Sequence, residues 1–226
     1  RNFVIPKGFN KGRVFINFGA VDQIATVFIN GNNVATHKGG YTSFKFEITD
    51  YVTDGENEIK VSCLDFSDDN AFSRGKQKTK RGGIWYTCQS GIWQSVWLES
   101  TPKKYLEKVK ITPNYDESSV SFKYFGCDDV EVSIYDGDSL IAKTKDTTVS
   151  IPDFKSWSPE SPFLYDVVFS ACGEEIKSYF GMRKFSVGND GKGVKRLFLN
   201  NKPYFHNGVL DQGYYPDGLL TPPAND

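Results

Sequence analysis

Apolar and polar residues alternate along most of the chain, and this period of two is typical of strands with one buried face. The alternation is clearest in Arg13 to Phe18, Ala25 to Ile29 and Ser43 to Ile48. Between apolar runs, Asn30-Gly31 and Asp136-Gly137 supply residues that tolerate a positive φ, as tight hairpins require. No segment has apolar residues at the spacing of a helix face. The pattern therefore predicts an all-β chain whose antiparallel sheets pack as sandwiches.

Two breaks divide this pattern into three predicted domains, 1–102, 103–185 and 186–226. The first break follows Trp97 to Glu99, where a polar segment with a proline precedes new alternating runs. These runs are spaced like a small immunoglobulin-type sandwich. The second break is Gly188 to Gly193, after which we expect Val194 to Leu199 and Pro203 to Leu210 to form a hairpin around Asn200-Asn201.

Composition and charge exclude several classes of protein. In 226 residues, 38% hydrophobic and 15% aromatic content is enough to build buried cores, so the chain is not disordered. The 27 basic and 28 acidic side chains leave a net charge of −1, so we expect no nucleic acid partner and no membrane partner. No run approaches the roughly eighteen apolar residues of a membrane-spanning helix. The N-terminus lacks the apolar core of a signal peptide, but a processed signal leaves no trace, so the compartment stays open.

The cysteines and the acidic loops predict neither a metal nor a cofactor. Cys63, Cys88, Cys127 and Cys172 form no CxxC pair and are too sparse for a disulfide scaffold, so we expect buried thiols. The Cys…Trp…Cys arrangement of immunoglobulin domains is also absent. Asp65 to Asn70 offers oxygen ligands but lacks the glycine and the distal glutamate of a calcium loop.

Candidate catalytic groups are weak throughout the chain. Neither His37 nor His206 lies near a reactive serine or cysteine motif. Arg74 to Arg81 is strongly basic, and without a glycine cradle it is predicted to be a solvated loop. Paired acids occur in polar turns, where solvated charge explains them better than catalysis does; the pairs are Glu56 and Glu58, Asp68 and Asp69, Asp128 and Asp129, and Glu174 and Glu175.

Asp211 and the tryptophans leave more room for a binding role. Asp211 follows the apolar run Gly208 to Leu210 and opens an aromatic, glycine-rich segment. Its pattern suits a binding residue and an Asx-capped turn equally well. Trp85, Trp93 and Trp97 crowd one segment, and a core role is favoured over a sugar-stacking platform.

Four groups of segments, in order along nearly the whole chain, resemble glycoside hydrolase family 2, the β-galactosidase and β-glucuronidase group. They are Phe18 to Asp22 with Val27 to Gly31 and His37 to Phe44; Ser90 to Glu99; Trp157 to Tyr165 with Tyr179 to Lys184; and Leu199 to Pro203 with Gly208 to Gly213. The resemblance implies an N-terminally incomplete, jelly-roll-like sugar-binding sandwich, an immunoglobulin-like β-sandwich and a short hairpin that leads into a (β/α)8 barrel.

The family resemblance also implies a function. The parent protein is expected to be a retaining exo-β-glycosidase of the β-galactosidase class, which hydrolyses O-glycosidic bonds in a carbohydrate substrate. The family's two catalytic glutamates lie on later barrel strands, so this chain is expected to be a non-catalytic accessory region with a barrel stub, inactive alone and without a catalytic residue. The alternatives are a stand-alone carbohydrate-binding module and a structural or oligomerisation sandwich. Exposed sheet edges predict a homo-oligomer.

Six residues are predicted to contact substrate on this resemblance. Asp211 and Gln212 fit the end of the first barrel strand, and Tyr214 and Asp217 continue into the following loop. Arg74 and Gln77 lie in a loop similar to one that extends from the family's first domain toward the barrel mouth.

Overall fold

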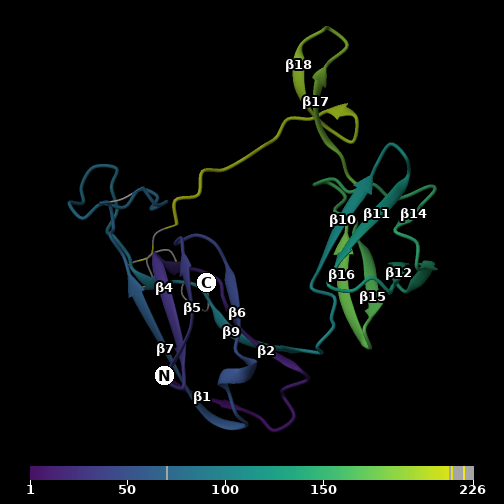
Figure 1. Cartoon of the computed structure of the whole chain (residues 1–226). Coiled ribbons are helices and arrows are strands. Elements are labelled where there is room, and N and C mark those ends of the chain that lie inside the picture. Colours follow the sequence, from purple (N-terminus) through teal and green to yellow (C-terminus); the bar gives the residue numbers. More distant parts are fainter. Residues whose placement is uncertain (70, 214, 216–220, 222–226) are drawn as a thin grey trace. The chain divides into compact units, whose positions relative to one another are not determined.

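The computed structural model describes residues 1–69, 71–213, 215 and 221, and these form two compact units. The first comprises Arg1–Lys103 with the described residues from Asp211 onward, and the second comprises Lys104–Leu210. Both are built from antiparallel strands, and a single 3-10 turn, η1 (Thr49–Tyr51), is the helical element of the described residues (Figure 1). The predicted all-β class is confirmed. No helix in the described part of the chain is both long and apolar enough to cross a membrane.

The first unit is a sandwich of two sheets with a short extra ribbon. One sheet has the strand order β1-β7-β4-β5, the other β6-β2-β9, and β3 pairs with β8. The strands are β1 (Asn2–Ile5), β2 (Arg13–Phe18), β3 (Val21–Asp22), β4 (Ile24–Ile29), β5 (Asn32–Lys38), β6 (Phe44–Glu47), β7 (Gly55–Leu64), β8 (Gly91–Ile92) and β9 (Val96–Thr101). The β4–β5 hairpin turns at Asn30 and Gly31, whose φ values are 48° and 81°, as the sequence predicted.

Alternate residues of β2 and β4 form the core of the first unit. Val14, Ile16 and Phe18 of β2 are buried against Val27 and Ile29 of β4 in one cluster. Each such side chain contributes about 1.5 to 3 kcal/mol by leaving water. The period-two pattern therefore placed both strands correctly: in β4 buried and half-buried residues alternate, and in β2 Phe15 and Asn17 on the opposite face are buried as well.

The second unit is a separate sandwich followed by a β-hairpin. Its sheets have the orders β10-β11-β14 and β13-β12-β15-β16, and the β17–β18 hairpin pairs further with the short β19. The strands are β10 (Lys108–Asn114), β11 (Ser119–Phe125), β12 (Val130–Asp136), β13 (Ser139–Thr144), β14 (Thr148–Ser150), β15 (Tyr165–Ala171), β16 (Glu174–Phe180), β17 (Phe185–Asn189), β18 (Lys195–Leu199) and β19 (Lys202–Pro203). Phe122 of one sheet packs edge-on against Phe169 and Phe180 of the other, with ring centroids 5.6 and 6.4 Å apart.

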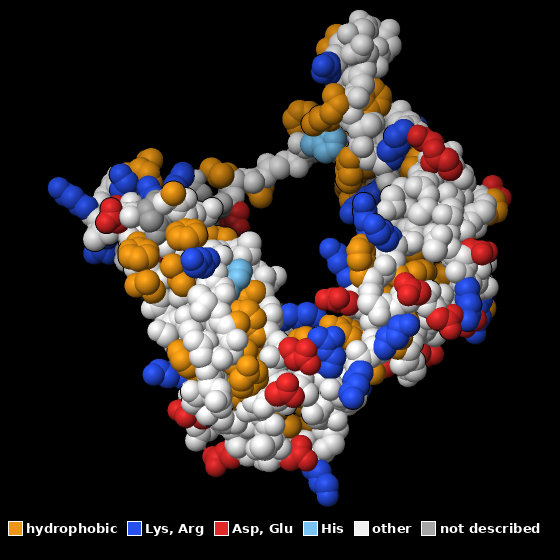
Figure 2. Space-filling view, viewed as in Figure 1, with side chains coloured by type: hydrophobic (Ala, Val, Ile, Leu, Met, Phe, Trp, Pro, Cys, Tyr) orange, Lys and Arg blue, Asp and Glu red, His pale blue; other side chains and the backbone are white. Residues whose placement is uncertain are grey.

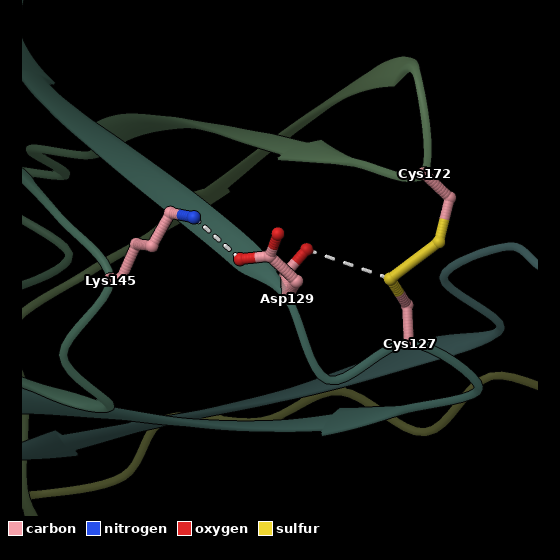
Figure 3. The surroundings of a disulfide bond; sticks show 4 residues. All are labelled: Cys127, Asp129, Lys145 and Cys172. Atoms are coloured by element: carbon pink, nitrogen blue, oxygen red, sulfur yellow. Dashed lines mark hydrogen bonds and ion pairs between the residues drawn. A yellow bond between two sulfur atoms is a disulfide. The ribbon is translucent and has the colours of Figure 1, made fainter.

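A disulfide between Cys127 and Cys172 links the β11–β12 connection to the β15–β16 turn in the second sandwich (Figure 3). Cys127 lies between β11 and β12, and Cys172 lies in the β15–β16 turn. The expectation of buried thiols was wrong for this pair. β12 pairs with β15 so that Val130 opposes Ala171, and this register brings the two cysteines to one end of the sandwich. The two free thiols are not buried, since Cys63 is exposed and Cys88 is half-buried.

The hairpin also differs from its prediction. Gly188 to Gly193, predicted as a break, belongs to the β17–β18 hairpin, because Val187 pairs with Leu197 and Asn189 with Lys195. The turn at Asn200-Asn201 is present, with φ values of 52° and 63°, but β19 is only two residues long. Beyond Pro203 the chain up to Leu210 forms no strand. In the described structure no strand pairs with these residues. Their alternating pattern was therefore not sufficient to form a β-strand.

Candidate functional site

The first unit carries a long loop, residues 65–90, between β7 and β8, and Gln77 fixes its shape. Gln77 is 4% exposed. Its Nε2 donates to the Tyr41 hydroxyl (2.9 Å) and to the carbonyl of Arg74 (2.8 Å), and its Oε1 accepts from the Gln89 amide (2.6 Å). A buried amide with its partners in place is rigid, and it leaves little capacity for a ligand. Gln77, predicted to contact substrate, thus holds the loop that carries Arg74.

Tyr86 connects this loop to the segment that begins at Asp211. The Tyr86 hydroxyl donates to Oε1 of Gln212 at 2.7 Å, across 126 positions of sequence. Asp211 is exposed, and its Oδ1 accepts from the Gly213 amide at 2.8 Å. This is the Asx turn that the sequence pattern allowed, and within the described residues Oδ2 of Asp211 accepts no hydrogen bond that would compete with a ligand. The structure therefore brings Gln212 beside the loop, although the two are far apart in sequence.

Arg74 lies half-buried in the same loop. The Thr79 hydroxyl donates to Asp68 at 2.7 Å and lowers the pKa of that carboxyl, and the charge of Arg74 lowers it further. Tyr214 and Asp217, also predicted to contact substrate, lie outside the described residues.

A buried carboxyl lies at the base of the loop. Asp22 at the end of β3 is 3% exposed, and its Oδ1 has no hydrogen-bond partner in the described structure. Burial, and to a lesser extent the negative charge of Asp65, raises the pKa of Asp22 from 3.8 to about 6. Asp65 itself accepts hydrogen bonds from the Ser67 amide (2.7 Å) and the Ser90 hydroxyl (2.5 Å). Ser90 precedes Gly91, the Cα partner of Asp22, so the two carboxyl groups belong to one cluster.

Sequence reasoning missed Asp22 and Tyr86 as parts of this site. Asp22 was visible only as the end of the run Phe18 to Asp22, and Tyr86 only as a member of the tryptophan-rich segment. Periodicity could not reveal them, because their partners come from other strands and loops.

The three tryptophans of the first unit are not core residues, contrary to the prediction. Trp97 is 48% exposed, and Trp85 and Trp93 are half-buried. The Trp93 indole donates to the carbonyl of Gly40 at 2.8 Å, and the ammonium of Lys78 lies 4.3 Å from the Trp85 ring. The core was filled instead by aliphatic residues and phenylalanine, which bring no polar N–H to satisfy.

The two histidines lie outside this loop and contact neighbouring side chains and backbone. His37 stacks on Phe44 and lies 3.1 Å from the Thr42 hydroxyl, and His206 contacts the carbonyl of Tyr204. Within residues 1–69, 71–213, 215 and 221, no group of three or more His, Cys, Asp or Glu side chains could hold a metal ion.

These features define an all-β protein with two sandwich units, the first of which carries a polar loop held by hydrogen bonds. Residues 1–102 match the family model for "Glycosyl hydrolases family 2, sugar binding domain". The resemblance of the chain to glycoside hydrolase family 2 is therefore confirmed.

Curated relatives and a solved structure resemble the chain over most of its length. A β-galactosidase of Streptococcus thermophilus is 24% identical over 237 residues, which cover 92% of this chain and 21% of the relative. A β-glucuronidase of Streptococcus agalactiae is 25% identical over 230 residues, covering 90% and 37%. The solved β-glucuronidase of Faecalibacterium prausnitzii has the same fold, with a TM-score of 0.78 at 24% identity over 99% of this chain and 42% of that one. The chain thus spans well under half the length of these relatives.

Proposed function

We propose that the chain is the accessory region of a retaining exo-β-glycosidase of the β-galactosidase class, which hydrolyses O-glycosidic bonds in carbohydrates. In this proposal residues 1–102 are the sugar-binding-type sandwich, 103–185 the immunoglobulin-like sandwich and 186–226 the first part of the catalytic barrel. The names of the relatives, β-galactosidases and β-glucuronidases, support this assignment.

The observation that carries the proposal is the hydrogen bond between Tyr86 and Gln212. Barrel enzymes build their active sites at the C-terminal ends of the barrel strands, and the segment after Leu210 is proposed to be the first such end. A loop of the sandwich that is bonded to this segment contributes its own side chains to the substrate face. We assign sugar-hydroxyl contacts to Arg74, Asp211 and Gln212, and to Tyr214 and Asp217 beyond them. Gln77 acts indirectly, by holding the loop.

Retaining hydrolysis needs two carboxyl groups about 5 to 5.5 Å apart, one as acid and one as nucleophile. We assign neither role to a residue of this chain. The chain alone is therefore expected to leave a chromogenic β-galactoside and a chromogenic β-glucuronide intact.

The test is to express the protein encoded by the complete gene and to follow both substrates, with the anomer of the first product read by NMR. Hydrolysis with retention is expected. Tyr86→Phe removes the hydroxyl that holds Gln212 and should raise KM several-fold, whereas Tyr179→Phe, at a tyrosine 64% exposed in the second unit, should not. A complete protein that hydrolyses no β-glycoside, or that inverts the anomer, would refute the proposal.

A stand-alone binding role is the second candidate, and a cleft in the first unit favours it. The cleft has a volume of about 610 Å³, lies between β1, β7, β2 and β9, and includes Phe3, Phe18 and the exposed Trp97 in its wall. Calorimetric titration with galactose and with glucuronate tests this binding role, and a flat isotherm at millimolar sugar excludes it.

The same apolar cleft lies at the edge strands β1 and β9, so we also propose that the chain self-associates. Gel filtration over a concentration series measures this self-association.

A further inference from the structure

Residues 74–81, here called the basic loop, concentrate positive charge in a chain whose net charge is −1. Five of these eight residues are cationic: Arg74, Lys76, Lys78, Lys80 and Arg81. Figure 2 shows lysine and arginine side chains gathered over this part of the first unit. Such a concentration produces a local positive potential that the chain-wide average hides.

The basic loop is held in place rather than free. Besides the three hydrogen bonds of the buried Gln77, the carbonyl of Lys76 accepts from the Tyr86 amide at 2.8 Å, and the Lys78 amide donates to the Tyr86 carbonyl at 3.2 Å. Cations on a fixed backbone lose less entropy on binding than cations on a mobile tail. This distinguishes the basic loop from an ordinary solvated run of charge, which is how the sequence alone was interpreted.

Most of the loop's charge is not neutralised by acids. Lys145, Lys155 and Lys184 of the second unit each form an ion pair with an aspartate. In the described part of the chain, by contrast, no ion pair involves Lys76 or Lys80, and both are exposed. Arg81 donates to the neutral hydroxyl of Thr87 at 3.1 Å.

The basic loop also adjoins the proposed substrate segment, because Tyr86 bonds both to the loop backbone and to Gln212. We propose that the basic loop binds the anionic groups of an acidic oligosaccharide. The substrate class of this site is then a polymer with repeated carboxylate or sulfate groups. Lys76, Lys80 and Arg81, which form no ion pair in the described part of the chain, exceed what one carboxylate needs, so an oligomer is favoured over a single acidic sugar. This inference rests on the proposed function, since it takes the Asp211 segment as substrate-facing.

The test is calorimetric titration of the chain with a galacturonic acid hexamer, a heparin-derived hexasaccharide, a neutral galactan hexamer, monomeric galacturonate and a short DNA duplex. We expect saturable binding of at least one acidic hexamer, at least tenfold tighter than binding of the neutral hexamer or the monomer. The two acidic hexamers separate carboxylate from sulfate recognition. Raising the salt concentration about tenfold should weaken the binding, because the contacts are electrostatic.

Matched variants locate the site. The double variant Lys76→Gln with Lys80→Gln should weaken binding at least tenfold. The control, Lys192→Gln with Lys195→Gln, removes the same charge from exposed positions of the β17–β18 hairpin and should change affinity less than twofold. Thermal unfolding of each variant verifies that the fold is retained.

Three outcomes would overturn the inference: no binding of either acidic hexamer, equal binding of the DNA duplex, or equal loss in the control variant. The proposed function is tested separately by hydrolysis of the two chromogenic β-glycosides by the complete protein. Activity without acidic-oligosaccharide binding rejects the inference alone, and binding without activity rejects the proposed function.

Discussion

Removing the Cys127–Cys172 disulfide should destabilise the second unit selectively. The bond closes a loop of 45 residues of sequence. In the chain-entropy treatment, a cross-link over roughly 45 residues raises the free energy of the unfolded state by about 4 kcal/mol. Disulfides typically stabilise by about 2 to 4 kcal/mol, so we expect the double variant Cys127→Ala with Cys172→Ala to lose about that much unfolding free energy.

Hydrogen-exchange mass spectrometry over a urea series measures this loss for each unit. Peptides from Lys104–Leu210 should lose protection at lower urea in the double variant, and peptides from the first unit should not shift. Wild-type chain in a strong reductant should behave like the variant. Thiol titration of the oxidised native chain should find the thiols of Cys63 and Cys88 only.

The control is the double variant Cys63→Ala with Cys88→Ala, which keeps the disulfide and removes the free thiols. It should unfold within about 0.5 kcal/mol of the wild type, as surface changes usually do. If the disulfide variant also falls within that margin, or if all four thiols titrate before reduction, the assigned cross-link is refuted.

Three further changes test the first unit. The pKa of Asp22 is about 6 in the folded chain, above its ordinary value of 3.8. Protonation of Asp22 therefore favours the folded state: its contribution to the free energy of unfolding is complete below about pH 4 and is lost as the pH rises through about 6, a change of roughly 3 kcal/mol. Asp22→Asn should therefore gain stability over the wild type progressively across that window in urea unfolding, and a difference that does not vary with pH would contradict the assigned burial. Gly40→Ala would put a Cβ 2.3 Å from Oδ1 of Asp22 and should cost about 2 kcal/mol or more, whereas Gly191→Ala, with open space, should be nearly neutral by thermal unfolding. Gln77→Ala removes the three hydrogen bonds that fix the basic loop, so trypsin should cut there several-fold faster; an unchanged cleavage rate would mean that Gln77 does not hold the loop.

Much of the fold could be predicted because its determinants are local. Arg13–Phe18 is a strand with the predicted bounds, and Asn30-Gly31 forms the predicted turn. In both cases a few neighbouring residues decide the conformation, by alternation in the strand and by tolerance of positive φ in the turn.

The candidate site could be predicted only in part. Asp211 was chosen from its surroundings in sequence and Arg74 from the family resemblance, and their role as substrate contacts stays a prediction. The contacts that define the site are the bond from Tyr86 to Gln212, the saturated amide of Gln77 and the burial of Asp22. Each joins segments that lie far apart in sequence.

The sequence by itself determined the all-β class, the approximate strands and the family resemblance, because periodicity, turn residues and motifs are properties of neighbouring residues. Only the tertiary structure decided that Cys127 meets Cys172, that the tryptophans stay outside the core and that the basic loop is held against the Gln212 segment. Strand pairing brings residues together across the whole chain, and a one-residue change in register alters every such meeting, so these contacts exist only once the sheets have formed.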